Sequence, residues 1–120
     1  MKDPIIIQKI LRKCCEALEG KKAESITVLD LKGKSTITDF MIVATATSEP
    51  HLRALRRIVE EVVDEEGFKI LGTDYQPLSG WLVVDGFEFM IHLFTEEKRE
   101  LYLIESLWND GIKLDWTKDL

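Results

Sequence analysis

The segment Phe40–Ala46, with the sequence FMIVATA, constrains the fold of this chain more than any other stretch. It is rich in strand-forming residues, yet apolar side chains do not alternate with polar ones along it. A strand of this kind is buried on both faces, so we expect it near the middle of a sheet with helices on at least one side. The segment therefore predicts a layered α/β domain.

Two amphipathic helices are expected to cover that sheet. The first begins at an N-cap, Asp3, with Pro4 in the first helical position, and it ends before Gly20. Its apolar residues recur at helical spacing: Ile7, Ile10, Leu11, Cys14 and Leu18. The second helix runs from Glu49 to about Glu66. Thr47 or Ser48 caps it, Gly67 stops it, and its inner stripe is Leu52, Leu55, Ile58, Val59, Val62 and Val63.

Four more strands and a last helix complete the expected order, which is α-β-β-α-β-β-β-α. The strands are Ser25–Leu31, Phe68–Leu71, Trp81–Val84 and Phe87–Phe94, the last two joined at a hairpin signal, Asp85-Gly86. Thr95 caps the final helix, which extends through Asn109. The prediction is a single α/β domain over residues 1–120, with one mixed β-sheet flanked by helices.

Composition removes several classes of function. The formal net charge of −6 argues against broad contact with nucleic acid or anionic lipid and favours a basic partner. No apolar run reaches the roughly 18–20 residues that cross a bilayer. The first residues do not resemble a signal peptide, so we expect a cytoplasmic protein without membrane contact. Cys14 and Cys15 are adjacent in a helical pattern, which indicates two buried thiols in a reducing compartment.

No catalytic, metal-binding or cofactor-binding constellation is evident. The triplet Gly33-Lys34-Ser35 lacks the earlier glycine of a phosphate loop, because Val28 occupies that position. Two-metal chemistry needs paired carboxylates, and Asp30 and Asp39 each stand alone. The two histidines have no nucleophile elbow beside them. His51 is expected at the surface, whereas His92 interrupts an apolar strand and could be structural or functional.

Large aromatic residues gather in the C-terminal half, interleaved with polar ones. Aromatic rings at partly exposed positions are typical anchors of protein interfaces, although for any single ring core packing is the stronger explanation. Trp108 is assigned to the core because it follows Leu107 and Ile104. The basic start of the second helix (Arg53, Arg56, Arg57) is either a solvated face or a further partner contact.

Four stretches, in this order and spacing, resemble the ribosomal silencing factor family (RsfS, or Iojap-like). They are Val28–Leu31, Thr38–Ala44 with Thr47-Ser48, Gly80–Asp85 and Met90–Phe94, the last extended by Arg99, Tyr102, Glu105 and Leu107-Trp108. The resemblance covers about Asp3 to Asp110. The chain departs from the family pattern at Ala46, at Pro50-His51 and in Thr73–Pro77.

The resemblance implies a fold distantly similar to nucleotidyltransferases but without their active site, and hence no enzymatic activity and no cofactor. It also implies binding to the large ribosomal subunit through the ribosomal protein L-fourteen. Binding there blocks joining of the small subunit and represses translation, and organellar relatives have a role in large-subunit assembly. Direct nucleic-acid binding is not expected as the main contact, and the protein is expected to be a monomer or homodimer.

On this interpretation the partner-binding residues lie in the C-terminal half. Trp81 and Phe94 are the expected apolar anchors, and Asp85 and Glu105 are the expected acceptors for Arg or Lys. His92 and Tyr102 orient them. Two alternatives stay open: a nucleotidyltransferase-like enzyme of unknown substrate, and an RNA-binding factor. The second would use a basic face drawn from Lys9, Arg12, Lys13, Lys21, Lys22 and the three arginines of the second helix.

Overall fold

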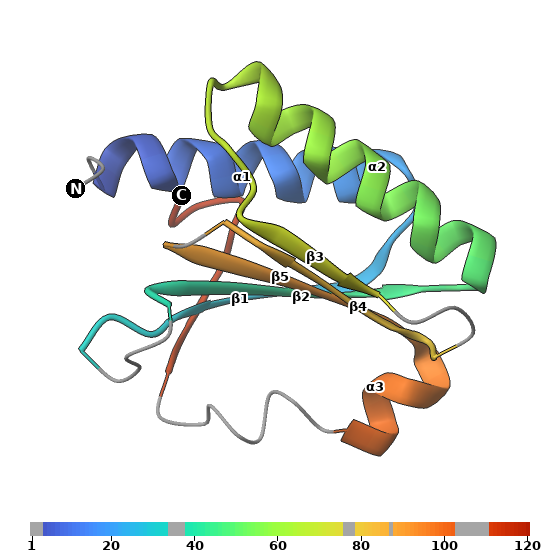
Figure 1. The fold of residues 1–120 in the computed structure, drawn as a ribbon. Helices are drawn as coiled ribbons and strands as arrows, with labels where there is room; N and C mark the ends of the chain where they lie inside the picture. The colour runs from blue at the N-terminus through green and yellow to red at the C-terminus, as the bar shows by residue number, and fades with distance from the viewer. Residues whose placement is uncertain (1–3, 34–37, 76–78, 87, 103–110) are drawn as a thin grey trace.

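The computed structural model describes residues 4–33, 38–75, 79–86, 88–102 and 111–120 (Figure 1). In chain order the elements are α1 (Pro4–Gly20), β1 (Glu24–Asp30), β2 (Phe40–Ala46), α2 (Glu49–Glu65), β3 (Gly72–Tyr75), β4 (Trp81–Asp85), β5 (Phe89–Thr95), α3 (Glu96–Tyr102) and β6 (Ile112–Leu114). The strands form one sheet in the order β3-β4-β5-β2-β1-β6. The helices α1 and α2 lie on one face and α3 lies on the other (Figure 1). The predicted α/β fold and order of elements are confirmed, and β6 extends that order by one strand.

The strand β2 is the centre of the sheet, as its sequence predicts. All seven of its residues are buried. It pairs antiparallel with β1 and parallel with β5, so both of its edges are hydrogen-bonded. Phe40, Ile42 and Ala44 join the main core on the helix side, while Met41 and Val43 point to the opposite face. Burial on both faces therefore explains why the segment shows no polar alternation.

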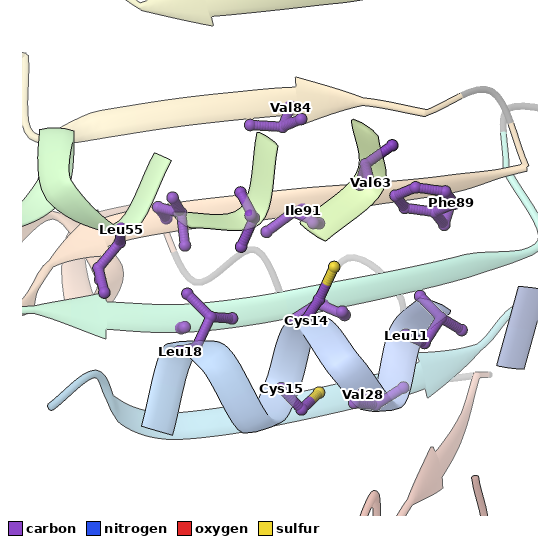
Figure 2. Packing of buried hydrophobic residues seen from close by; sticks show 14 of the residues in the cluster. Leu11, Cys14, Cys15, Leu18, Val28, Leu55, Val63, Val84, Phe89 and Ile91 are labelled. Carbon is purple, nitrogen blue, oxygen red and sulfur yellow. The ribbon is translucent and has the colours of Figure 1, made fainter. Parts of the chain in front are cut away.

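The main core lies between the sheet and the two long helices. Figure 2 shows side chains of α1 and α2 meeting those of the strands; it labels Leu11, Cys14, Cys15, Leu18, Val28, Leu55, Val63, Val84, Phe89 and Ile91. Both cysteines are fully buried, as expected. Burial raises the pKa of the Cys14 thiol to about 12, and it raises the pKa of the Cys15 thiol as well. Two protonated, enclosed thiols are packing residues.

The boundaries of α2 follow from its sequence. Of the two predicted caps, Ser48 is the one used: its side-chain oxygen accepts the His51 backbone N–H at 3.1 Å. Gly67, with φ +76°, follows the last turn in the left-handed conformation that favours glycine. The helix buries Leu52, Leu55, Val59 and Val63 from the predicted stripe, and Ile58 and Val62 pack at its margin.

The predicted strand Phe68–Leu71 is wrong, because the strand lies at β3, directly after it. Phe68 and Ile70 are apolar because they pack against the main core from an irregular segment, which imitates the alternation of a strand. In the described sheet β3 is an edge strand that pairs with β4, and its Thr73 is exposed. Exposed edge positions such as Gly72 and Thr73 impose no apolar pattern on the sequence. The returning strand also begins later than predicted, at Phe89.

The C-terminal part divides into described and undescribed segments. The helix α3 begins at Glu96, directly after Thr95, as predicted. The rest of the predicted helix, up to Asn109, lies outside the described residues, and so does the assignment of Trp108 to the core. The unpredicted strand β6 pairs with β1, after which Trp116 and Leu120 pack against the main core. The Arg12 guanidinium donates a hydrogen bond to the Leu120 carbonyl at 3.0 Å, so the C-terminal residues are tied to α1.

Candidate partner-binding site

The strand β4 alternates in burial, and along both β4 and β5 successive side chains point to opposite faces of the sheet. Leu82 and Val84, with Phe89, Ile91 and Leu93, enter the main core. The side chains between them point to the other face: Trp81, Val83, Asp85, Met90, His92 and Phe94. A second, smaller cluster of buried residues lies on that face, formed by Leu29, Leu31, Met41, Val43 and Phe94 with Trp81 packed against it. Four of the six predicted site residues therefore share one face of two neighbouring strands.

Trp81 is the centre of an aromatic cluster on this face. Trp81 and Phe94 are register partners on neighbouring strands, and their rings stack with centroids 5.3 Å apart and planes inclined by 20°. His92 lies alongside, with ring centroids 6.0 Å from Trp81 and 6.2 Å from Phe94. The Trp81 side chain is half-buried. Its indole is thus supported from beneath and keeps part of its surface exposed, which suits an interface anchor.

His92 is held in one protonation state by its surroundings. The Trp81 indole Nε1–H donates a hydrogen bond to His92 Nδ1 at 3.1 Å. An indole nitrogen is only a donor, so Nδ1 is unprotonated and the ring proton lies on Nε2. The residue is 5% exposed, and burial lowers the pKa of His92 to about 4. His92 is therefore neutral near pH 7 and fixes the orientation of the Trp81 ring.

The expectation that Phe94 is itself an exposed anchor is wrong, because its side chain is 0% exposed. It lies beneath Trp81 and belongs to the second buried cluster. A ring that is fully covered cannot contact a partner in this conformation. Its role is to support Trp81.

A depression adjoins the aromatic cluster on the same face. It has a volume of about 460 Å³ and is lined by Gly72, Thr73, Trp81, Val83, Asp85, Met90 and His92. Trp81, Val83 and Met90 are the apolar side chains of its lining, and the half-buried Asp85 contributes a carboxylate. Apolar surface with a carboxylate beside it is complementary to a long basic side chain, whose stem is apolar and whose end is cationic.

The other two predicted site residues are only partly located. Tyr102 is the last residue of α3, and the position of its side chain lies outside what the structure describes. Glu105 lies outside the described residues altogether. Their suggested roles, to orient the anchors and to accept a basic group, stay predictions.

Two residues that shape the site carried no assigned role in the sequence. Glu49 in the first turn of α2 accepts the Gly80 backbone N–H at 2.8 Å. Arg99 on α3 donates to Thr45 Oγ1 at 2.8 Å, to Thr27 Oγ1 at 3.1 Å and to the Ser25 carbonyl, which ties α3 to β1 and β2. Arg99 belongs to one of the stretches that carry the family resemblance. For Glu49 the sequence gives no signal, since its partner is 31 residues away.

His51 and Arg56 of α2 lie on the helix side of the sheet and have structural contacts. His51 Nδ1 accepts the Thr47 backbone N–H at 2.9 Å, and Nε2 lies 2.6 Å from the Lys21 carbonyl, so His51 joins α2 to the end of α1. Arg56 pairs with Glu60 at 3.5 Å along the helix. In the part of the chain that the structure describes, three metal-ligating side chains do not come together at any point, and no helix is long and apolar enough to cross a membrane.

These features define a class: a small α/β domain whose second sheet face carries a half-buried tryptophan with a carboxylate near it. Within that class the chain belongs to the RsfS family, described as ribosomal silencing factor during starvation, whose family model matches residues 4–119. The ribosomal silencing factor RsfS of Halalkalibacterium halodurans is 30% identical over 104 residues, which are 87% of this chain and 89% of that protein. The crystal structure of a Chromobacterium violaceum protein superposes with a TM-score of 0.82 at 33% identity, covering 91% of this chain and 90% of that one. The mitochondrial assembly of ribosomal large subunit protein 1 of Mus musculus is 29% identical over 96 residues, 76% of this chain and 41% of that protein.

Proposed function

We propose that this protein is a cytoplasmic ribosomal silencing factor that binds the large ribosomal subunit and sterically prevents the small subunit from joining. The observation that carries the proposal is the match to the RsfS family over residues 4–119. Several relatives are named ribosomal silencing factors, and the mouse relative is named for assembly of the mitochondrial large subunit. Repression of translation is the main activity in this proposal, and a role in large-subunit assembly is compatible with the same binding.

The proposed contact on the large subunit is the ribosomal protein L-fourteen. Trp81 is the apolar anchor, supported by Phe94 and oriented by His92. Asp85 and Glu105 accept Arg or Lys side chains of the partner, and Tyr102 helps to orient the contact. Ribosomal proteins present basic groups to their surroundings. This chain has a net charge of −6, so long-range attraction would add to the local charge pairs.

The proposed mechanism needs no chemical step. A steric blocker acts through an interface that overlaps the surface used by the small subunit, and occupancy alone determines its effect. The rival proposal, a nucleotidyltransferase-like enzyme, requires a micromolar site for a nucleotide and metal. Calorimetry with magnesium and each nucleoside triphosphate distinguishes the two: we expect no binding below a Kd of about 1 mM, and a micromolar site would favour the enzyme.

Subunit joining in a sucrose gradient tests the proposal directly. Purified protein added to separated subunits should reduce the joined-ribosome peak without consumption of ATP or GTP. Crosslinking in the same sample should connect the protein to the ribosomal protein L-fourteen. An unchanged peak at saturating protein, with large-subunit binding intact, contradicts silencing and leaves the assembly role. A crosslink to ribosomal RNA alone contradicts the proposed contact.

A further inference from the structure

Gly80, the residue before the proposed anchor Trp81, is fixed on several sides by parts of the chain that are distant in sequence. Its N–H donates to Glu49 Oε1 at 2.8 Å, and its carbonyl accepts the Thr95 N–H at 2.9 Å. Its φ of +73° is in the region that favours glycine. A Cβ at this position would lie 2.5 Å from Lys98 Cγ and 2.7 Å from Thr95 Oγ1. The corner that precedes β4 therefore has one tightly determined conformation.

The Glu49 side chain reaches this corner from a well-anchored helix terminus. Glu49 is half-buried in the first turn of α2, where a carboxylate interacts favourably with the helix dipole. The turn itself is held by the Ser48 cap and by the His51 contact with the Lys21 carbonyl. A hydrogen bond from a backbone N–H to a carboxylate is one of the stronger hydrogen bonds in a protein. Glu49 is thus a firm link between the helix layer and the first residue of β4.

The position of the Trp81 ring depends on this corner. Trp81 is the first residue of β4, so its backbone direction is set by Gly80. Its N–H lies 3.3 Å from Ser79 Oγ, and its indole must still reach His92 Nδ1 at 3.1 Å. We propose that Glu49 is a positioning residue of the partner-binding surface: by holding Gly80 it sets the place from which Trp81 presents its indole. This inference rests on the proposed function of the Trp81 surface.

Three substitutions separate this role from an effect on the helix. Glu49→Ala removes the contact and the charge. Glu49→Asp keeps the charge at the helix terminus, but its carboxylate is one methylene short of Gly80. Glu49→Gln loses the charge and keeps an oxygen that can accept the Gly80 N–H. Glu61→Ala, on an exposed residue of the same helix, is the matched control. Thermal unfolding of each variant reports whether its fold is intact.

Affinity for the isolated large subunit is the first measurement. We expect Glu49→Ala and Glu49→Asp to bind about tenfold more weakly, and Glu49→Gln to stay within about threefold of the wild type. In a Trp81→Ala background Glu49→Ala should have no further effect, since Glu49 acts through that ring. Binding by Glu49→Asp as tight as that of the wild type overturns the inference, and so do independent, additive effects of the two residues.

The indole N–H resonance of Trp81 is the second measurement, and it needs no partner. A Trp81→Phe variant identifies the signal among the three tryptophans. It should shift in Glu49→Ala and Glu49→Asp but not in Glu49→Gln or Glu61→Ala. If Trp81→Ala binds the large subunit as the wild type does, the proposed surface is wrong, and this resonance alone decides the positioning role. An unmoved resonance in Glu49→Asp refutes it.

Discussion

On one face of the sheet, α1 and α2 cover a continuous cluster of buried apolar residues that extends through both helices and across β1, β2, β4 and β5. On the other face, the described residues bury a cluster of five with a half-buried tryptophan at its margin. The same strands supply both, through alternate residues. The comparison separates two tasks: the helix-covered face determines the fold, and the second face has enough buried support to hold an aromatic surface in place.

The largest effect is expected on the helix-covered face. Phe89 is fully buried there, with its ring against Gly86. Phe89→Ala should lower the free energy of unfolding by about 3–5 kcal/mol, since it removes apolar contacts and leaves a cavity. Denaturant unfolding measures this. The control Ile5→Ala, at a residue 74% exposed, should change it by less than about 0.5 kcal/mol. A loss under about 1 kcal/mol for Phe89→Ala would contradict the contrast between the faces.

The second face should make the stability of the protein depend on pH, because its buried His92 titrates and the apolar residues of the main core do not. With a folded pKa of about 4, against about 6.5 when unfolded, His92 is neutral in both states above pH 6.5. Between pH 6.5 and 4 the His92 imidazole is protonated in the unfolded chain but stays neutral in the folded chain. The free energy of unfolding therefore falls as the pH falls. The loss in free energy of unfolding that is due to His92 approaches about 3 kcal/mol at the acidic end of this range.

The measurement is the difference between two stability profiles. His92→Gln keeps an acceptor for the Trp81 indole but does not titrate, and the carboxylates of both proteins titrate alike. The stability of the wild type relative to this variant should decline from pH 6.5 to 4 and level off below. Parallel profiles would show that His92 is not buried as neutral imidazole.

Trp81→Ala should distinguish a surface anchor from a core residue. We expect a loss of about 2 kcal/mol in binding to the large subunit, near thirtyfold in Kd. Stability should fall by much less than the roughly 3–5 kcal/mol of an emptied core site, because the ring is half-buried. Both are measured on the same variant. A collapse of stability would assign Trp81 to the core. If neither quantity changes, the arginine-rich start of α2 becomes the next candidate contact.

The smallest effect concerns the attachment of α3 to the second face. Arg99→Lys keeps the charge but cannot reproduce the contacts with Thr27, Thr45 and Ser25, since an ammonium lacks the fork of a guanidinium. We expect a loss of about 1 kcal/mol in stability. Arg57→Lys, on an exposed residue of α2, should change nothing measurable. Equal unfolding midpoints for the two variants would contradict a structural role for Arg99.

The elements predicted best are those whose burial imposes a periodicity on the sequence. β2 is apolar throughout because it is covered on both faces, and α2 repeats its apolar residues along one stripe. The edge strands β3 and β6 escaped prediction because exposed positions such as Thr73 and Lys113 impose few apolar constraints on the sequence. Phe68 and Ile70 led to the wrong strand prediction because they alternate with polar residues as a strand would. They are apolar because they contact the core from a segment outside any strand.

The sequence predicts on which face of the sheet each residue of the candidate site lies, but it does not predict which residues of β4 and β5 pair. A two-residue turn at Asp85-Gly86 would set Trp81 opposite Met90, whereas the observed register pairs Trp81 with Phe94 and Asp85 with Met90. The difference of four residues is even, so every side chain keeps its face. Alternation alone therefore places Trp81, His92 and Phe94 together. The complete burial of Phe94 and the contact from Glu49 depend on packing between distant segments, which no local pattern encodes.

The parallel pairing of β2 with β5 also has a kinetic consequence. Phe40 is opposite Phe89, forty-nine residues later in the chain, and Val28 of β1 is opposite Leu114 of β6, eighty-six residues later. Each pairing requires a long loop to close before its hydrogen bonds form. Chains dominated by such distant contacts fold more slowly than helical bundles of equal length. The central strand β2 (Phe40–Ala46) pairs with β5 along one edge, and β5 comes much later in the chain. The β5-facing edge of this apolar segment therefore stays unpaired until most of the chain has been synthesised.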